Sequence, residues 1–302
     1  MRIVAALGGN ALLERGEVPE AEIQQKHVEA AVTALAPLAL ENDLIVTHGN
    51  GPQVGLLALE SARDPELPHP YPFDVLGAQT QGMIGYFLIQ ALDNALPGQQ
   101  VVGMITQTLV AQDDPAFSDP TKFVGPIYSQ AQSQRLSRRW GWQMRRDGTV
   151  WRRVVPSPEP KEIVELAAIR MLVGDGAVVV CAGGGGIPVT RHKDGTLRGV
   201  EAVIDKDLTA ALLAKALNAD LLLLLTDVTA LEADYGTAAA RPIRHITPLE
   251  LAKMALPAGS MGPKAQAASQ FVSGTNHVAA IGRLEQAADL VAGTSGTIIT
   301  DH

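Results

Sequence analysis

The chain opens with Arg2-Ile3-Val4-Ala5-Ala6-Leu7-Gly8-Gly9-Asn10, an apolar run of strand length that stops at two glycines. The same pattern recurs at His48-Gly49-Asn50-Gly51-Pro52, which follows an apolar run, and at Gly183 to Pro188, which follows another. Segments with the apolar spacing of helices lie between these runs. Strands that alternate with helices predict an α/β fold whose mainly parallel sheet is covered on both faces.

The alternation extends along the chain, with no internal repeat and no low-complexity linker. We expect strands at Arg2–Leu7, Asp43–Thr47, Gln100–Thr106, Ala177–Cys181, Asp220–Leu225, His277–Ile281 and Thr297–Thr300. We expect helices at about Pro19–Glu41, Gly55–Glu60, Phe73–Asn94, Pro160–Leu172, Asp205–Leu217, Pro248–Ala255 and Pro263–Ser273.

Residues from about 111 to 160 interrupt this rhythm. The segment is rich in Asp, Pro, Ser and Arg, and two alternating runs flank Asp147-Gly148, a preferred pair for a tight hairpin turn. We therefore expect a small β-containing excursion that projects from the main body. A lid and a purely structural flap are both consistent with such a segment.

The composition narrows the class of function. A formal net charge of −8 and a pI of about 5.4 argue against binding to nucleic acid or to anionic lipid. No signal peptide is expected, because the first apolar run breaks at Gly8-Gly9, and Leu221–Leu225 is too short to span a membrane. We therefore expect a cytoplasmic protein. Cys181 is the single cysteine, so an internal disulfide and a thiolate metal cluster are excluded, and we expect it in the core.

The three glycine-rich turns point to an anion site. In an open parallel sheet, ligands bind beyond the carboxyl ends of the strands, where glycine lets backbone N–H groups approach an anion. The common nucleotide motifs are absent: there is no G-x-x-x-x-G-K-[ST], the glycine spacing of G-x-G-x-x-G is incomplete, and no H-R-D or D-F-G occurs. Phosphoryl transfer would therefore use another scaffold.

Three lysines stand out in a chain with 16 Arg and only 8 Lys. Lys122 lies on the excursion, whereas Lys206 and Lys264 lie just inside expected helix starts, where a cation opposes the helix dipole. Mobile ammonium groups at an anion site would neutralise a transferring phosphoryl group. Asp207 would orient them, although an acid in a first helical turn also has a purely structural explanation. For His48 we favour a structural role.

The ordered set of motifs resembles the carbamate kinases of the amino acid kinase family over essentially the whole chain. The segments that carry the resemblance are Ala6–Ala11, Thr47–Gly55, Thr80–Tyr86, Pro120–Lys122 with Gly125-Pro126, Trp151–Pro158, Gly183–Pro188, Gly199–Asp207, Leu225–Val228 and Gly259–Lys264. Departures are small: Phe123-Val124 after the lysine of the excursion, and the variable stretch Leu231–Gly236.

This resemblance implies a three-layer αβα sandwich, with one domain over residues 1–302 and a protruding subdomain at about 111–160. It implies reversible transfer of a phosphoryl group between ATP and carbamate, with Mg²⁺ held mainly by the nucleotide phosphates rather than by protein ligands. It further implies a homodimer, and a role in making ATP during arginine or purine breakdown.

The resemblance also assigns residues to roles. Catalytic roles fall to Lys122, Lys206, Asp207 and Lys264. The carbamate or the phosphoryl group would be held by Gly8, Gly9, Asn10, Gly49, Asn50, Gly51, Gly184 and Gly185. The nucleotide would contact Thr226, Asp227, Tyr235 and Met261. Two other functions compete with this one: a kinase for a different acceptor, such as an acylated amino acid or a nucleoside monophosphate, and a non-catalytic sensor of anions or nucleotides.

Overall fold

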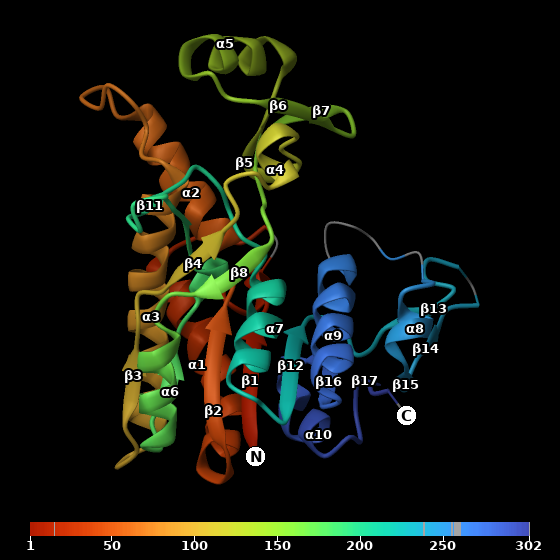
Figure 1. Cartoon of the computed structure of the whole chain (residues 1–302). Coiled ribbons are helices and arrows are strands. Elements are labelled where there is room, and N and C mark those ends of the chain that lie inside the picture. The colour runs from red at the N-terminus through yellow and green to blue at the C-terminus, as the bar shows by residue number, and fades with distance from the viewer. Residues whose placement is uncertain (15, 238, 255, 257–260, 302) are drawn as a thin grey trace.

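The computed structural model describes residues 1–14, 16–237, 239–254, 256 and 261–301. Its centre is an eight-stranded sheet with the order β15-β17-β16-β12-β1-β2-β9-β3 (Figure 1). Neighbouring strands are parallel except that β17 runs antiparallel to β16. The bounds are β1 Arg2–Leu7, β2 Asp43–His48, β3 Val101–Gly103, β9 Val178–Val180, β12 Leu221–Thr226, β15 His245–Ile246, β16 Val278–Arg283 and β17 Thr297–Ile299.

Helices cover both faces of this sheet, which confirms the predicted fold class. On one face pack α1 Ala21–Glu41, α3 Phe73–Ala95 and α10 Ala287–Val291. On the other pack α6 Leu166–Gly174, α7 Lys206–Ala216, α8 Pro248–Leu251 and α9 Met261–Thr275. The strands are buried on both sides, because successive residues such as Ile3 and Val4 belong to opposite cores. This double burial explains why the strands appear in the sequence as continuous apolar runs.

A smaller sheet lies beside the main one, with the order β11-β10-β4-β8. It contains β4 Gln107–Val110, β8 Pro160–Ile163, β10 Ile187–Arg191 and β11 Leu197–Gly199. The helix predicted from Pro160 is therefore wrong in its first half. Pro160 and Ile163 are buried against β4 while the two residues between them are exposed, so strand pairing overrides the helical appearance of this stretch.

Residues 115–155, here named the projecting segment, extend above the carboxyl ends of the strands (Figure 1). They form α4 Pro115–Ser118, β5 Lys122–Tyr128, α5 Gln130–Trp140, β6 Met144–Asp147 and β7 Val150–Val155, with sheet order β5-β7-β6. The predicted hairpin is present, but its turn is one residue further along: Asp147 pairs with Val150, and Gly148 with φ +61° begins the loop. Helix α5 was not predicted.

The remaining described elements are α2 Gly51–Arg63, short 3-10 turns at Gly9–Ala11, Gly183–Gly185 and Leu284–Gln286, and the two-stranded pair β13 Glu232–Ala233 and β14 Arg241–Pro242. A search of the described residues for helices with the length and apolar character needed to cross a membrane finds none.

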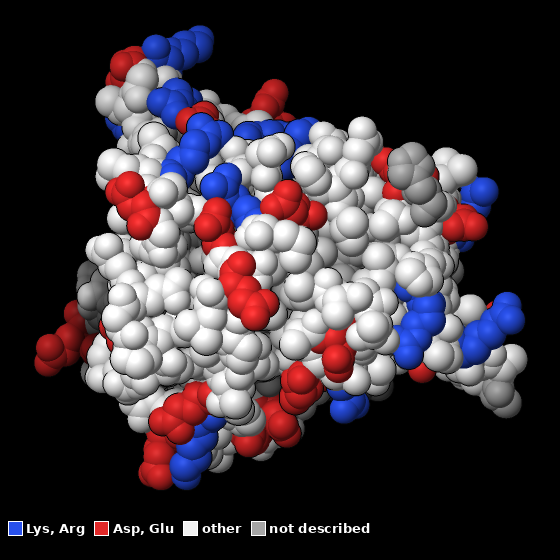
Figure 2. Space-filling view, turned by 90° about the horizontal axis from the view of Figure 1, so that it is seen from below, with Lys and Arg blue, Asp and Glu red and all other residues white. Residues whose placement is uncertain are grey.

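On the face seen in Figure 2, acidic and basic side chains form small separate groups on a largely uncharged surface.

Leu223 tests the two-sided burial of the central strands. It is fully buried in β12, so Leu223→Ala is expected to lower the free energy of unfolding by about 2–5 kcal/mol, through lost apolar burial and the cavity left behind. Leu40→Ala, at a site in α1 that is 72% exposed, is the matched control and is expected to change it by no more than about 0.5 kcal/mol. Urea titrations of both variants measure the difference, and equal losses would contradict this account of the core.

Candidate active site

The glycine-rich turns after β1, β2 and β9 meet at one end of the main sheet. Gly8 donates its N–H to the carbonyl of Leu225, and Gly49 donates to that of Leu7. A Cβ at Gly49 would lie 3.0 Å from the backbone nitrogen of Gly9, and one at Gly184 would lie 2.2 Å from the Asn50 side chain. Close approach of the turns, rather than conformational freedom alone, therefore excludes larger residues here.

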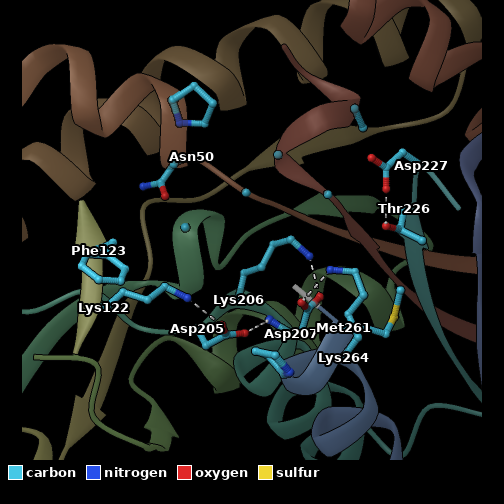
Figure 3. Close-up of a pocket in the computed structure, with 18 of the residues that line it drawn as sticks. Asn50, Lys122, Phe123, Asp205, Lys206, Asp207, Thr226, Asp227, Met261 and Lys264 are labelled. Atoms are coloured by element: carbon cyan, nitrogen blue, oxygen red, sulfur yellow. Dashed lines mark hydrogen bonds and ion pairs between the residues drawn. The ribbon is translucent and has the colours of Figure 1, made fainter. Parts of the chain in front are cut away.

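These turns form the floor of a cavity of about 1350 Å³ (Figure 3). Its walls include fourteen of the sixteen residues that the sequence singles out: Gly8, Gly9, Gly49, Asn50, Gly51, Lys122, Gly184, Lys206, Asp207, Thr226, Asp227, Tyr235, Met261 and Lys264. Gly185 lies behind the wall, where its carbonyl accepts hydrogen bonds from the Thr108 and Thr209 hydroxyls. The side chain of Asn10, and with it Ala255 and Gly259-Ser260, lies outside the described residues.

Asp207 is the centre of the charged group. Its carboxylate is 4% exposed, contacts the Lys206 ammonium through one oxygen, and accepts a hydrogen bond from Lys264 at 3.1 Å through the other. Burial alone would raise the pKa of Asp207, but the two lysines outweigh it and lower the pKa. Burial lowers the pKa of Lys206, and the charge of Lys264 lowers it further, whereas Asp207 opposes both. The carboxylate therefore supports the charged form of Lys206 and holds the two ammonium groups close together.

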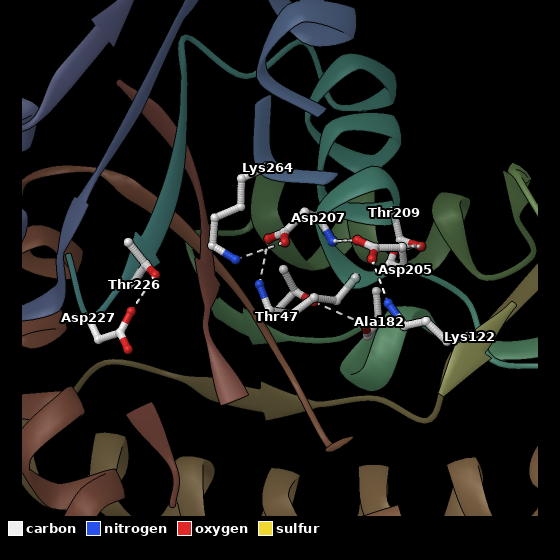
Figure 4. A network of polar contacts seen from close by, with 10 residues as sticks. Thr47, Lys122, Ala182, Asp205, Asp207, Thr209, Thr226, Asp227 and Lys264 are labelled. Atoms are coloured by element: carbon white, nitrogen blue, oxygen red, sulfur yellow. Dashed lines mark hydrogen bonds and ion pairs between the residues drawn. The ribbon is translucent and has the colours of Figure 1, made fainter. Parts of the chain in front are cut away.

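Asp205 has a second partner that the sequence does not indicate. It caps α7, where its side chain accepts from the N–H of Asp207 at 3.0 Å. Its other oxygen accepts from the ammonium of Lys122 at 3.0 Å, which joins the projecting segment to the main body (Figure 4). The two residues are 83 positions apart, so only the three-dimensional structure brings them together.

The predicted helix starts are confirmed for both remaining lysines. Lys206 is the first residue of α7, and Lys264 lies in the first turn of α9. The start of α7 and both ammonium groups therefore contribute positive potential to the same region. Thr226 and Asp227 line the opposite side of the cavity from Lys122 (Figure 3), and the Thr226 hydroxyl donates to the Asp227 carboxylate at 3.1 Å. Lys122 and the pair of Thr226 with Asp227 thus lie on opposite sides of the cavity.

Comparisons with known proteins show which family the chain resembles. The family model of the amino acid kinase family matches residues 1–282. The carbamate kinase of Rhizobium meliloti is 52% identical over 99% of this chain and 93% of the relative, and that of Escherichia coli K12 is 50% identical over 99% of both. A structure of the carbamate kinase from Giardia lamblia bound to AMP-PNP has a TM-score of 0.92 and 39% identity, over 99% of this chain and 98% of that one.

The chain belongs to the amino acid kinase family, and within it to the carbamate kinases. The resemblance predicted from the motifs is therefore confirmed, as is the prediction of an ATP-dependent kinase. A solved structure of another kind shares only the fold: an N-acetylglutamate synthase from Neisseria gonorrhoeae is 17% identical with a TM-score of 0.61, over 61% of its own length.

The kinase supports its glycine turns with a set of threonine hydroxyls that sequence reasoning missed. Thr47 donates to the carbonyl of Ala182, and Thr106 accepts from its N–H, both at 3.0 Å. These bonds hold Ala182 at φ +52°, a left-handed conformation that costs about 1 kcal/mol for a residue with a Cβ. Thr209 and Thr108 both donate to the carbonyl of Gly185 (Figure 4 shows Thr47, Ala182 and Thr209). No local motif marks these positions, because a buried threonine is common in strands, loops and helices alike.

Two other predictions concern residues outside the cavity wall. Cys181 is 1% exposed and burial raises its pKa to about 12, which confirms it as a core residue. His48 is also buried and donates from Nδ1 to the Gly49 carbonyl at 2.9 Å, in agreement with a structural role. Within the described residues, no three His, Cys, Asp or Glu side chains are grouped so that they could hold a metal ion.

His48 makes the stability of the kinase depend on pH. Burial lowers its pKa from 6.5 to about 4, with the Gly49 hydrogen bond opposing this and Lys206 adding to it. Below pH 6.5 the unfolded chain therefore binds a proton that the folded chain excludes, so the free energy of unfolding falls as the pH drops from 6.5 toward 4. The loss from this group between pH 7 and pH 5 is about 2 kcal/mol.

The measurement is the free energy of unfolding against pH for the parent and for His48→Gln. We expect the parent to lose about 2 kcal/mol more than the variant between pH 7 and pH 5, whatever their difference at pH 7. Equal pH dependence in the two proteins would show that folding does not lower the pKa of His48.

Proposed function

We propose that this kinase transfers a phosphoryl group reversibly between ATP and carbamate. The observation that carries the proposal is the arrangement of Lys206 and Lys264 on either side of Asp207, at the edge of the glycine turns. Transfer of a phosphoryl group needs little covalent chemistry from a protein, and mostly needs position and positive charge. We identify the acceptor as carbamate because the relatives that resemble this chain over nearly its full length are carbamate kinases.

The roles follow from the place of each residue. The N–H groups of the turns at Gly8-Gly9 and Gly49 to Gly51 hold the carbamate and the migrating phosphoryl group. Lys206 and Lys264 neutralise the charge on the phosphates, and Asp207 fixes their separation. Lys122 reaches the cavity from the projecting segment, and its ammonium leaves Asp205 to contact the transferring phosphoryl group. The nucleotide contacts another part of the cavity wall, formed by Thr226, Asp227, Tyr235 and Met261.

The reaction requires no general base. A carbamate oxygen is already an anion, so it attacks the γ-phosphorus directly while the bond from phosphorus to the bridging oxygen of ADP breaks. The groups nearest the lysines fit this chemistry: Asp205 and Asp207 are engaged with lysines, and His48 lies outside the wall with a pKa of about 4. In-line geometry and neutralised charge then supply most of the rate.

Mg²⁺ fits the site as a companion of the nucleotide. The oxygens of Asp205 and Asp207 are taken by lysine ammonium groups and a backbone N–H, so the phosphate oxygens of ATP or ADP would be its main ligands. When bound, the ion neutralises phosphate charge and orients the phosphates. Lys206 and Lys264 contribute to the same neutralisation from the protein side.

The chemistry of the substrates favours the direction that makes ATP. Carbamoyl phosphate is a mixed anhydride, and the carbamate released breaks down to ammonia and carbon dioxide, which draws the reaction forward. This direction suits a catabolic role, in the breakdown of arginine or purines. We further propose a cytoplasmic homodimer, and light scattering on the purified protein would detect twice the 31.8 kDa of one chain.

The first test is ATP formation from ADP, Mg²⁺ and carbamoyl phosphate. We expect rapid synthesis by the parent, and a loss of at least about a hundredfold in kcat for Lys206→Ala, because an ammonium group that faces the developing charge is missing. A luciferase assay follows ATP directly, with spontaneous breakdown of carbamoyl phosphate as the blank.

A folded parent that binds ADP but makes no ATP above the blank would exclude carbamate as the acceptor. Phosphorylation of an acylated amino acid or a nucleoside monophosphate would then identify a different kinase. Binding of nucleotide without turnover on any acceptor would point to a sensor.

Asp207→Asn tests the two-lysine arrangement. Without the carboxylate, the buried ammonium groups repel each other and the pKa of Lys206 falls further, so the lysine loses its charge at a lower pH. We expect kcat to fall by about a hundredfold, and the alkaline limb of its pH profile to move to lower pH. Asp119→Asn, a change at an exposed carboxylate on the projecting segment, is the control and should leave both unchanged. An unshifted profile for Asp207→Asn would contradict this role.

A further inference from the structure

The reach of Lys122 depends on how the projecting segment is attached to the main body. Lys122 begins β5, and its partner in the antiparallel pair is Val155, the last residue of β7. Arg153 of β7 pairs with Val124 of β5, so Lys122, Val124, Arg153 and Val155 lie on one face of this ribbon. Whatever holds Arg153 therefore also sets the position of the backbone from which Lys122 extends.

Arg153 is a buried cation at the base of the projecting segment. Its side chain is 10% exposed and its guanidinium makes an ion pair with Glu201 of the main body. The guanidinium carbon lies 4.0 Å from the ring centre of Trp142 and 4.9 Å from that of Phe73. Trp142 belongs to the projecting segment and Phe73 is the first residue of α3, so Arg153 is packed between the two parts of the molecule.

Glu201 completes the attachment on the side of the main body. Its second oxygen accepts from the backbone N–H of Phe73 at 2.9 Å, at the start of α3, where an anion is favoured by the helix dipole. Four residues further along the same loop, Asp205 holds Lys122. Between them, the N–H of Val203 donates to the carbonyl of Pro156 at 3.0 Å, just after β7 ends. One short loop therefore contacts the projecting segment at Arg153 and Lys122, and contacts the residue that follows it, Pro156.

The two ion pairs of this loop differ in which partner is shielded from water. In the first, the Arg153 side chain is 10% exposed and that of Glu201 is 43% exposed; in the second, Lys122 is 39% exposed and Asp205 is 13% exposed. Separating Arg153 from Glu201 would leave a cation among aromatic rings without its carboxylate, which is strongly unfavourable. Lys122 faces the cavity, and Asp205 keeps its hydrogen bond from the N–H of Asp207, so the ammonium can move from Asp205 to an incoming anion at little cost. One pair is suited to hold the segment, and the other to change partner.

We propose that Arg153, through Glu201, is a positioning residue that sets the distance from which Lys122 reaches the transferred phosphoryl group. The assignment rests on the proposed function, in which Lys122 contacts that group. Val124 and Val155, which pack with Phe73 and Leu76 in a small separate core, hold the ribbon in place but leave its tilt to the pairing of Arg153 with Glu201. Arg153 itself touches no substrate in this account.

A double-mutant cycle tests the proposal. Arg153→Met removes the charge and keeps much of the packing, and Lys122→Ala removes the group that it positions. We expect Arg153→Met to lower kcat by about tenfold to a hundredfold in the parent, as a displacement of about 1 Å does in other enzymes, with a smaller change in the KM for ADP. In the Lys122→Ala background the same substitution should change kcat by less than about twofold, because the group being positioned is gone.

Two further variants separate position from general damage. Arg153→Lys keeps the charge but not the planar stacking between the two rings, and is expected to recover part of the lost kcat. Arg145→Met removes an arginine of the same segment that pairs with Asp119 at the surface, and is expected to leave kcat within about twofold of the parent. An equal loss from Arg153→Met in the parent and in the Lys122→Ala background would overturn the proposal.

The attachment also has a readout that needs no turnover. The three tryptophans of the chain, Trp140, Trp142 and Trp151, all lie in the projecting segment, so intrinsic fluorescence reports on this segment alone. We expect Arg153→Met and Glu201→Gln to change the emission and to raise its quenching by acrylamide, with the far-UV circular dichroism unchanged. Unchanged emission and quenching in both variants would overturn the proposed attachment, even if the parent proves to act on a different acceptor. Changed emission in a protein without kinase activity would overturn only the proposed function.

Discussion

The site depends on one constraint: a buried carboxylate must lie between two lysines that come from different helices. Asp207 and Lys206 stand at the start of α7, and Lys264 stands in the first turn of α9. Burying three charges is unfavourable unless each finds its partner, so α7 and α9 must pack side by side on the same face of the sheet. The apolar residues of these helices provide that packing. The core of this face and the charge of the cavity are thus parts of one arrangement.

The glycine turns impose a second constraint from the other side of the cavity. They approach one another so closely that a Cβ at Gly184 or Gly185 would overlap Asn50 or Ile204. The backbone N–H groups can point toward a ligand only because no side chain separates the turns. The threonine hydroxyls beneath them satisfy the carbonyl groups that such sharp turns leave without strand partners. The shape of the cavity on this side is set by small residues, and its charge comes from the lysines of α7 and α9 on the other side.

Local patterns predicted the central sheet well because its strands are buried on both faces and appear as unbroken apolar runs. They failed at Pro160–Ile163, where pairing with β4 decides the conformation, and at α5, a helix whose polar sequence has little apolar periodicity. The candidate site was predictable because its residues lie in short motifs. The pairing of Lys122 with Asp205 and that of Arg153 with Glu201 could not be predicted, because the partners are far apart in the sequence.

The molecule therefore uses ion pairs in two ways that the burial of the cation distinguishes. Lys206 and Lys264, which pair with Asp207, and Arg153, which pairs with Glu201, have side chains no more than 12% exposed, so their positions are fixed before any substrate arrives. Lys122 is 39% exposed, and its ammonium can leave Asp205 for a stronger anion. The proposed phosphoryl transfer uses both kinds of cation. The fixed cations need no reorganisation as charge develops, and the mobile cation closes over the transferring phosphoryl group. A kinase with only mobile lysines would lose the preorganisation, and one with only fixed lysines would have no cation that closes over the substrate.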